Sequence, residues 1–406
     1  FITFTGDGNL ALSSTVTTLG TLSNDIGTVA YDGVDQTIRQ DAYYNLIIGG
    51  SSGTKSLNNT TSVNNNFTVN EGATFFDGTN RPFTVNGSSD INGTLRISNT
   101  GDIQFNGDFD ASGGEITFDG IGNLNLASTV TSLGTLSEDI GTVTYAGTDQ
   151  AIFSDTYNHL VIGGSSGTKT LAGDISVNSD LTLNAGITLD VSSSNNYSIS
   201  VGGDWTDNGT FSSQEGTVTF NGNTSQVLTP GDSSFYNLTI NKNAFNDSVT
   251  IAADIDIDNQ LTFSDGTLDL NTNNPIITLG GDLTISSGAV WTSGGGTDIT
   301  FNGAAQSLSD ANTTPNNLGD ARINSGVLTV TTNSTFNSFR INSSGKAIIE
   351  TGVTMEIYQG DLIIDGELEM ADGSLVDGVG NTNFNNTLSG ILDMDGSSRM
   401  EMEGNL

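Results

Sequence analysis

The only histidine is the first side chain that could act as a general base. His159 lies in the alternating segment 158–162, and the matching position of other repeats holds Asn45, Asn237 or Asn317. A nucleophilic serine or cysteine is usually activated by a histidine held in place by a third group. Because the position of His159 in the repeat already explains its presence, we predict a structural role for it and no Ser/His/Asp arrangement.

Carboxylates are the second candidates, because glycoside hydrolysis needs only a pair of acids at a suitable separation. Asp254, Asp256 and Asp258 alternate along one strand, with Ile255 and Ile257 between them. Successive side chains of a strand point to opposite faces. We therefore expect the two isoleucines to point inward and the three acids to form a solvated outer face, where stacked acids could attract a cation.

A sugar-cleaving enzyme would interrupt its repeat with clustered acids, a basic residue and aromatic rings for stacking. Arg340, Tyr358 and the acids near Asp361 come closest to such a set, but they are scattered along the sequence. Glu367 and Glu369 also alternate on one strand and are expected on its outer face. We therefore assign no catalytic residue and predict that the chain is not an enzyme.

Metal ligation has little support in the sequence. There is no cysteine, so a thiolate site is excluded. The two Gly-Gly-Asp turns, which end at Asp204 and Asp282, lack the full calcium-binding nonapeptide. We predict no cofactor and no dedicated metal site, and expect only loose binding of divalent cations such as calcium to the acidic surface.

The charge of the chain excludes other classes of function. Its 46 acidic and 10 basic residues give a formal net charge of −36. Nucleic-acid binding depends on lysine and arginine to displace counterions, so we expect no nucleic-acid partner. No apolar run reaches transmembrane length, so membrane insertion is not expected.

Internal repetition dominates the sequence. The segment from Ile2 to Leu57 returns at Ile116 to Leu171 with a constant offset of 114 residues and no gap. A shorter unit of alternating apolar residues ending in glycine recurs further along, and each copy is followed by a glutamine. The four copies and their glutamines are 29–33 with Gln36, 143–147 with Gln150, 218–222 with Gln226, and 299–303 with Gln306.

Short strands broken by Gly, Asn and Asp turns explain this pattern, because apolar residues alternate with polar ones throughout and no helical period is sustained. Strands of this length must stack on neighbours to bury a continuous core. We predict an all-β protein, a parallel β-solenoid (β-helix) of tandem repeats, with tandem β-sandwich modules as the alternative. The expected divisions are module 1 at 1–114, module 2 at 115–215, module 3 at 216–296, a partial module 4 at 297–345, and divergent methionine-containing terminal rungs at 346–406.

Three segments carry a resemblance to known proteins: 201–205 (VGGDW), 216–222 (GTVTFNG) and 235–240 (FYNLTI). They resemble the β-helical repeats of very large bacterial surface proteins, with filamentous-haemagglutinin-like and autotransporter-like adhesins as the nearest family type. The resemblance implies a secreted, elongated scaffold that bridges cells or surfaces. A polysaccharide-binding or polysaccharide-cleaving β-helix is the alternative.

The expected partners follow from the same picture. The first strand, Phe1 to Phe4, corresponds to Glu115 to Phe118, and alternation persists almost to Leu406. Uncovered solenoid ends expose strand edges and apolar columns. We expect the chain to continue end to end, within a longer polypeptide or by head-to-tail docking, and to meet cell-surface glycans or other cells.

Overall fold

The computed structural model describes residues 1–242, 247–358, 360–380, 383–386 and 390–402. These residues form β-strands and no helix. The fold is a parallel β-solenoid of about 18 turns with a repeat of about 21 residues. The predicted solenoid is confirmed. The β-sandwich alternative is wrong, because every strand pair recorded between described residues is parallel, as in neighbouring turns β2 and β5.

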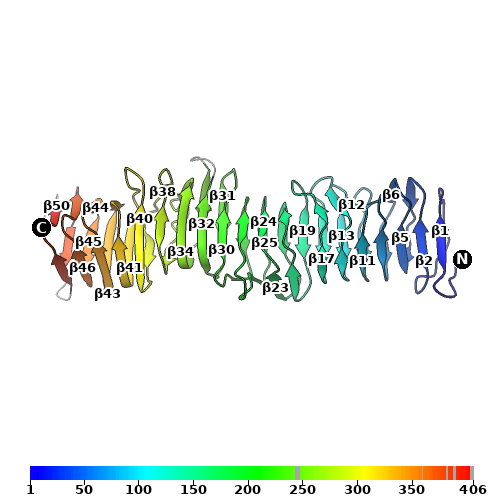
Figure 1. The fold of residues 1–406 in the computed structure, drawn as a ribbon, viewed down its shortest axis with the longest axis horizontal. Coiled ribbons are helices and arrows are strands. Elements are labelled where there is room, and N and C mark those ends of the chain that lie inside the picture. Colours follow the sequence, from blue (N-terminus) through cyan, green and yellow to red (C-terminus); the bar gives the residue numbers. More distant parts are fainter. Residues whose placement is uncertain (243–246, 359, 381–382, 387–389, 403–406) are drawn as a thin grey trace. The chain divides into compact units, whose positions relative to one another are not determined.

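The chain divides into two compact units: Phe1–Tyr197 with Asn208–Thr210, and Ser198–Asp207 with Phe211–Leu406. In the first unit each full turn contributes one strand to each of three sheets (Figure 1). The first sheet contains β1 (Asn9–Leu12), β2 (Thr28–Tyr31), β5 (Asn45–Ile48), β8 (Phe67–Val69), β11 (Ser89–Ile91), β14 (Phe109–Asp110) and β17 (Val130–Ser132). The second contains β3 (Gln36–Ile38), β6 (Thr54–Leu57), β9 (Thr74–Phe76), β12 (Thr94–Ile97), β15 (Glu115–Phe118) and β18 (Thr135–Leu136). The third contains β4 (Ala42–Tyr43), β7 (Thr61–Val63), β10 (Phe83–Val85), β13 (Asp102–Phe105), β16 (Asn123–Leu126), β19 (Thr142–Tyr145), β22 (His159–Ile162) and β25 (Leu181–Leu183).

The last turns of the first unit continue on two further ladders. These are β20 (Gln150–Ile152), β23 (Gly167–Leu171) and β26 (Ile187–Asp190), and β21 (Thr156–Tyr157) with β24 (Ile175–Val177). The strand β29 (Thr210–Ser212) lies where the sequence passes from one unit to the other.

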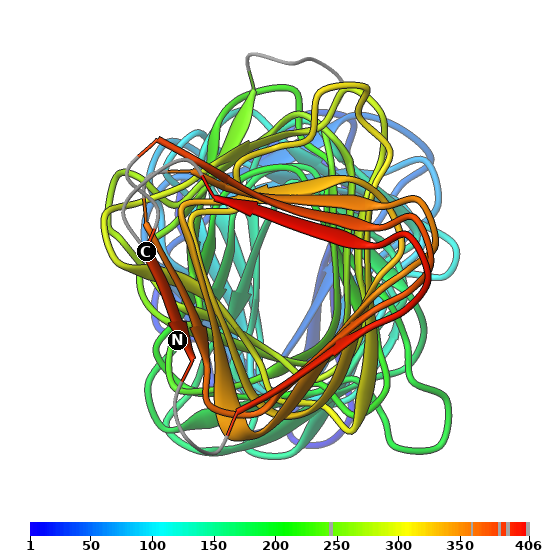
Figure 2. The ribbon, with the colours of Figure 1, turned by 90° about the vertical axis from the view of Figure 1, so that its left-hand side faces the viewer.

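The second unit is also a stack of parallel turns, but some of its strands are longer and bend around a corner, so that they belong to two faces of the solenoid. In Figure 2 its yellow to red turns follow one another around a common interior. One sheet contains β28 (Trp205–Asp207), β31 (Gln226–Thr229), β33 (Ser248–Ile251), β35 (Thr267–Asp269) and β38 (Val290–Thr292). The largest contains β27 (Ile199–Val201), β30 (Thr217–Phe220), β32 (Phe235–Asn241), β34 (Ile255–Asp265), β36 (Ile277–Leu279), β37 (Leu283–Ile285), β39 (Thr297–Phe301), β40 (Ala305–Asp310), β41 (Asp320–Val330), β43 (Ser338–Ile349), β45 (Asp361–Ile364), β46 (Glu367–Met370), β48 (Asn383–Asn386) and β49 (Ile391–Met394). The third contains β42 (Ser334–Phe336), β44 (Thr354–Tyr358), β47 (Leu375–Val379) and β50 (Arg399–Met402), so the methionine-containing rungs continue the same architecture.

Long strands bend at a corner that requires glycine. The strand β41 pairs with β39 through Asp320–Ile323 and with β40 through Val327–Val330. Between these stretches Gly326 has φ of 74°, in the left-handed region. A side chain there would also collide with the Gly303 carbonyl of the preceding turn. The corner therefore needs glycine for both conformation and space.

The core consists of inward side chains stacked from turn to turn. Strand residues alternate between buried and partly exposed, as in Leu181, Thr182 and Leu183. In the first unit Phe67 packs against Phe75 and Phe83 with ring centroids 5.0 and 4.9 Å apart. Such pairs stabilise beyond the area that they bury. The predicted inward face of the alternating runs is confirmed.

The duplicated segments occupy different faces of the first unit. The strand β2 lies in the first sheet, whereas its counterpart 114 residues later, β19, lies in the third sheet. The reason is that 114 residues do not make a whole number of turns of about 21 residues. The same sequence therefore fits more than one face of the solenoid.

The four glutamines that follow the repeated unit join adjacent turns, and we call them the inter-turn glutamines (Gln36, Gln150, Gln226 and Gln306). The amide nitrogen of Gln150 donates to the carbonyls of Leu126 and Ser128 on the preceding turn, at 3.0 and 2.5 Å. Its amide oxygen accepts the Gly147 N–H at 2.9 Å. All four side chains are buried and make this same set of contacts. Each satisfies a glycine N–H and one carbonyl of the preceding turn, while the other carbonyl also accepts a backbone N–H, as Leu126 does from Ala146.

Paired tyrosines hold another corner in each copy of the duplicated segment. The hydroxyls of Tyr145 and Tyr157 lie 2.9 Å apart. Tyr145 accepts the N–H of Phe153 at 3.0 Å, and Tyr157 donates to the Phe153 carbonyl at 2.5 Å. Tyr31 and Tyr43 make the same contacts around the earlier corner residue, Arg39.

Candidate functional site

The lone histidine occupies a structural position. His159 begins β22, and its Nδ1 accepts the N–H of Asp180 at 3.4 Å. In the earlier copy Asn45 Oδ1 accepts the N–H of Asn66 at 3.1 Å. Asp180 and Asn66 are 114 residues apart and occupy the same position in the two copies of the repeat. The backbone N–H at this position is thus bound by either a histidine or an asparagine side chain. This contact agrees with the role predicted from the repeat.

The three alternating aspartates face solvent, as predicted, while Ile255 and Ile257 are buried. Asp256 and Asp258 line a hollow of about 400 Å³. Asp258 accepts a hydrogen bond from Ser234 Oγ at 2.7 Å, and Asp254 accepts the N–H of Ile276 at 2.9 Å. Two of the three acids thus fasten neighbouring turns to each other.

The Gly-Gly-Asp turns have the same fastening role. Asp204 accepts the N–H of Val227 at 2.8 Å, and Asp282 accepts the N–H of Ser307 at 2.7 Å. Each aspartate therefore binds the backbone of the following turn. In the described part of the chain no group of three or more histidine, aspartate or glutamate residues could hold a metal ion.

Glu367 and Glu369 both form an ion pair with Lys346, which could not be identified from the sequence. Lys346 Nζ lies 2.8 Å from Glu367 Oε1 and 2.5 Å from Glu369 Oε2. Hydrogen bonds to both carboxylates raise the pKa of Lys346 above its usual value. Lys346 is the register partner of Glu367 on adjacent strands, so this pair belongs to the outer surface of the sheet.

Among the buried aspartates, Asp77 is the most fully buried. Asp77 is fully buried and accepts the N–H and the hydroxyl of Ser98 at 2.7 and 2.9 Å. Burial raises its pKa to about 6, against the opposing effect of these hydrogen bonds. Because its folded-state pKa exceeds the unfolded value, Asp77 contributes stability that is present below about pH 4 and is lost as the pH rises to about 6.

We therefore expect Asp77→Asn to stabilise the first unit at pH 7, by up to about 2 to 3 kcal/mol, because the burial of a charge is removed. The gain should shrink toward zero near pH 3.5, since the wild-type carboxyl is then protonated. Urea unfolding at several pH values measures both effects. The exposed Asp90→Asn is the matched control and should show neither. A gain for Asp77→Asn that is constant between pH 3.5 and 7 would contradict this account.

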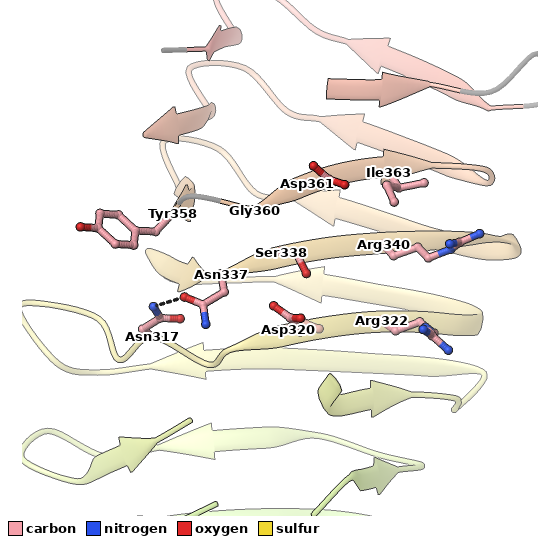
Figure 3. A pocket seen from close by; sticks show the side chains of 11 residues that line it. Asn317, Asp320, Arg322, Asn337, Ser338, Arg340, Tyr358, Gly360, Asp361 and Ile363 are labelled. Carbon is pink, nitrogen blue, oxygen red and sulfur yellow. Dashed lines mark hydrogen bonds between the residues drawn. The ribbon is translucent and has the colours of Figure 1, made fainter. Parts of the chain in front are cut away.

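The residues that looked scattered in the sequence line one groove, which we call the Arg322 groove. Arg340, Tyr358 and Asp361 all border this hollow of about 700 Å³ in the second unit. Figure 3 shows them with further polar side chains from neighbouring turns. The other lining residues are Asn317, Asp320, Ala321, Arg322, Asn337, Ser338, Gly360 and Ile363. Successive turns thus bring groups that are far apart in the sequence to the border of one hollow.

Arg322 was not identified from the sequence as a candidate site residue. It is the register partner of Arg340 on the adjacent strand, 18 residues later. A spacing close to one turn is the only signal that could have paired them.

In the described part of the chain, no residue belongs to a helix that could cross a membrane. Compared with known proteins, the chain matches no family model, no curated protein and no solved structure.

Proposed function

We propose that this chain is an extracellular structural or adhesive scaffold, acting at the cell surface as a rigid repeat rod or a filament subunit. One observation carries the proposal: polar side chains throughout both units fasten one turn to the next. The inter-turn glutamines do so. Asp204 and Asp282 do so at the corners of Gln226 and Gln306, since each aspartate binds the N–H of the residue that follows the glutamine. Repeat proteins gain their stability from such nearest-neighbour contacts.

The proposal also includes the type of protein family that the sequence resembles and the expected partners. The resemblance of 201–205 to the repeats of filamentous-haemagglutinin-like and autotransporter-like adhesins supports a secreted surface protein. Parallel rungs offer N–H and C=O groups that further rungs can pair with. Self-association end to end, or continuation in a longer chain, is therefore the first kind of partner. Cell-surface glycans or other cells are the second.

Electron microscopy of the purified protein tests the scaffold directly. We expect elongated, unbranched particles, and no turnover when polysaccharide, peptide or ester substrates are added. The acids Asp254 and Asp258 are engaged in fastening turns, which is the physical reason to expect no turnover from that strand. Compact particles, or turnover that is abolished by an aspartate or glutamate substitution, would contradict the proposal.

A further inference from the structure

The Arg322 groove has the regular construction of a site for a repeating ligand. Three strands of adjacent turns, β41, β43 and β45, form its floor. Arg322 and Arg340 are register partners, and Ile363 continues their column. Asp320 is the register partner of Ser338 in a second column. Figure 3 shows Asp361 at the end of the second column and Tyr358 beyond it.

The position of Arg322 beside Arg340 is not explained by the fold. Like charges directly opposite one another on adjacent strands are destabilising. Arg340 is held by Asp365 at 2.7 Å and by Asn342 at 3.0 Å. The side chain of Arg322 makes no ion pair or hydrogen bond with any other residue that the structure describes. In a chain with 46 acidic residues, a guanidinium without a carboxylate partner in a polar hollow points to an external acceptor.

The mixture of groups indicates a ligand that both donates and accepts hydrogen bonds. Arginine side chains only donate, whereas the carboxylate of Asp320 only accepts. Asn317 and Asn337 do both, and already orient each other through a bond of 2.7 Å. Sugar hydroxyls match such a set, because each hydroxyl donates one hydrogen bond and accepts others.

An aromatic ring completes the chemistry. Tyr358 is 42% exposed in the described structure, although large apolar side chains are otherwise mostly buried. An exposed tyrosine offers a ring face for the C–H surface of a sugar and a hydroxyl for its edge. The carboxylates of Asp320 and Asp361 border the groove and balance the charges of Arg322 and Arg340, so the groove offers no excess positive charge to a ligand with its own carboxylates. These features favour a neutral saccharide.

We propose that the Arg322 groove binds a neutral glycan chain, which runs across the strands with about one sugar ring per turn. Adjacent strands are spaced by about 4.8 Å, close to the length that one pyranose ring adds to a chain. The chain crosses the strands obliquely, from Arg322 on β41 past Ser338 on β43 to Tyr358 on the opposite side of the groove. The guanidinium of Arg322 donates to ring hydroxyls, and Tyr358 stacks on a ring at the rim.

This site rests on the glycan partner of the proposed function and assigns that partner to a groove, but it does not depend on the elongated shape of the scaffold. A scaffold without the glycan site would still give elongated particles, and a failure to form them would leave the groove intact. The binding experiment below therefore fails or succeeds separately from the electron microscopy.

Binding is tested with the whole chain and a panel of soluble hexasaccharides built from glucose, galactose or mannose, together with uronate-containing hexasaccharides of equal length. We expect at least one neutral hexasaccharide to bind, measured by isothermal titration calorimetry. Arg322→Ala and Tyr358→Ala should each weaken it by roughly tenfold or more, since each removes a hydrogen bond or a stacking surface. Arg81→Ala is the matched control, because Arg81 is exposed, lies in the first unit and likewise has no ion pair with a described residue.

Thermal unfolding of each variant keeps the test interpretable, and the proposal requires unchanged transitions for Arg322→Ala and Tyr358→Ala. Three results would overturn it: no neutral hexasaccharide binds; Arg322→Ala binds as well as Arg81→Ala; or the uronate-containing ligands bind more tightly with a strong dependence on salt. Release of shorter sugars during the titration would also overturn it, since that would show cleavage by the acids of the groove.

Discussion

Replacing Gln150 by leucine is expected to destabilise the first unit by about 2 to 4 kcal/mol. The substitution keeps a buried side chain of similar size but removes its two donated hydrogen bonds and the one that it accepts. The Gly147 N–H and the Ser128 carbonyl would then lose their partner, at about 1 to 3 kcal/mol for each group left unsatisfied, whereas the Leu126 carbonyl still accepts the N–H of Ala146. Partial replacement by water reduces the sum to the expected range.

The control for this prediction is Gln104→Leu. Gln104 lies on β13 and its amide donates to Asn106 in an exposed contact, so its loss should change the free energy of unfolding by less than about 0.5 kcal/mol. Urea unfolding followed by circular dichroism measures both variants. In Gln150→Leu, amide hydrogen exchange should show the largest loss of protection at the corner where the end of β16 lies against the start of β20 on the next turn. Equal stability of the two variants would mean that the inter-turn glutamines do not hold the turns together.

The alternation of apolar and polar residues was sufficient to predict the strands and their inward faces. Ile255 and Ile257 are buried because a strand presents every second side chain to the same face, whatever the order of the turns. The repeat also marked the glutamines as special. Their role could not be predicted, since it depends on which carbonyls of the preceding turn lie within reach, and Gln150 contacts residues 22 and 24 positions earlier.

The Arg322 groove could not be predicted for the same reason. Turn lengths vary, so that 18 residues separate the partners Arg322 and Arg340, and 23 separate Arg340 and Ile363. Residues that stack in space therefore have no fixed spacing in the sequence. The sequence pointed to Arg340, Tyr358 and Asp361 as the right kinds of residue. Only the register of the strands shows that they border one hollow.

The duplicated segments show how little the local sequence determines about position around the axis. Because β2 and β19 lie on different faces, the identity of a face is set by the summed length of the preceding turns. The local contacts are nevertheless kept, as the two tyrosine pairs show. Conserved corners with variable spacing are the expected result when each turn packs only on its neighbours.

Those tyrosine pairs lead to the second large expected effect, a steep loss of stability in alkali. Burial raises the pKa of Tyr31, Tyr43, Tyr145 and Tyr157 above the usual value of 10. The unfolded chain therefore releases protons that the folded chain retains, and the free energy of unfolding falls as the pH rises above 10. Between pH 10 and its own folded-state pKa, each tyrosine lowers the free energy of unfolding by up to about 1.4 kcal/mol per pH unit.

The buried lysines of the same unit have the opposite effect at lower pH. Burial lowers the pKa of Lys55 and Lys169, so the unfolded chain binds more protons than the folded chain just below pH 10.5. Their contribution to stability rises as the pH approaches 10.5. We therefore expect the first unit to keep its stability up to about pH 10 and to unfold cooperatively above it.

Absorbance at 295 nm, which reports tyrosinate, and circular dichroism should follow this unfolding together. In the wild type, part of the tyrosinate signal should appear only with the loss of β structure. Replacing Tyr31, Tyr43, Tyr145 and Tyr157 by phenylalanine should remove that part of the signal and make unfolding less steep in pH. Full ionisation of the wild-type tyrosines while the β spectrum is intact would show that the paired hydroxyls are not shielded by the fold.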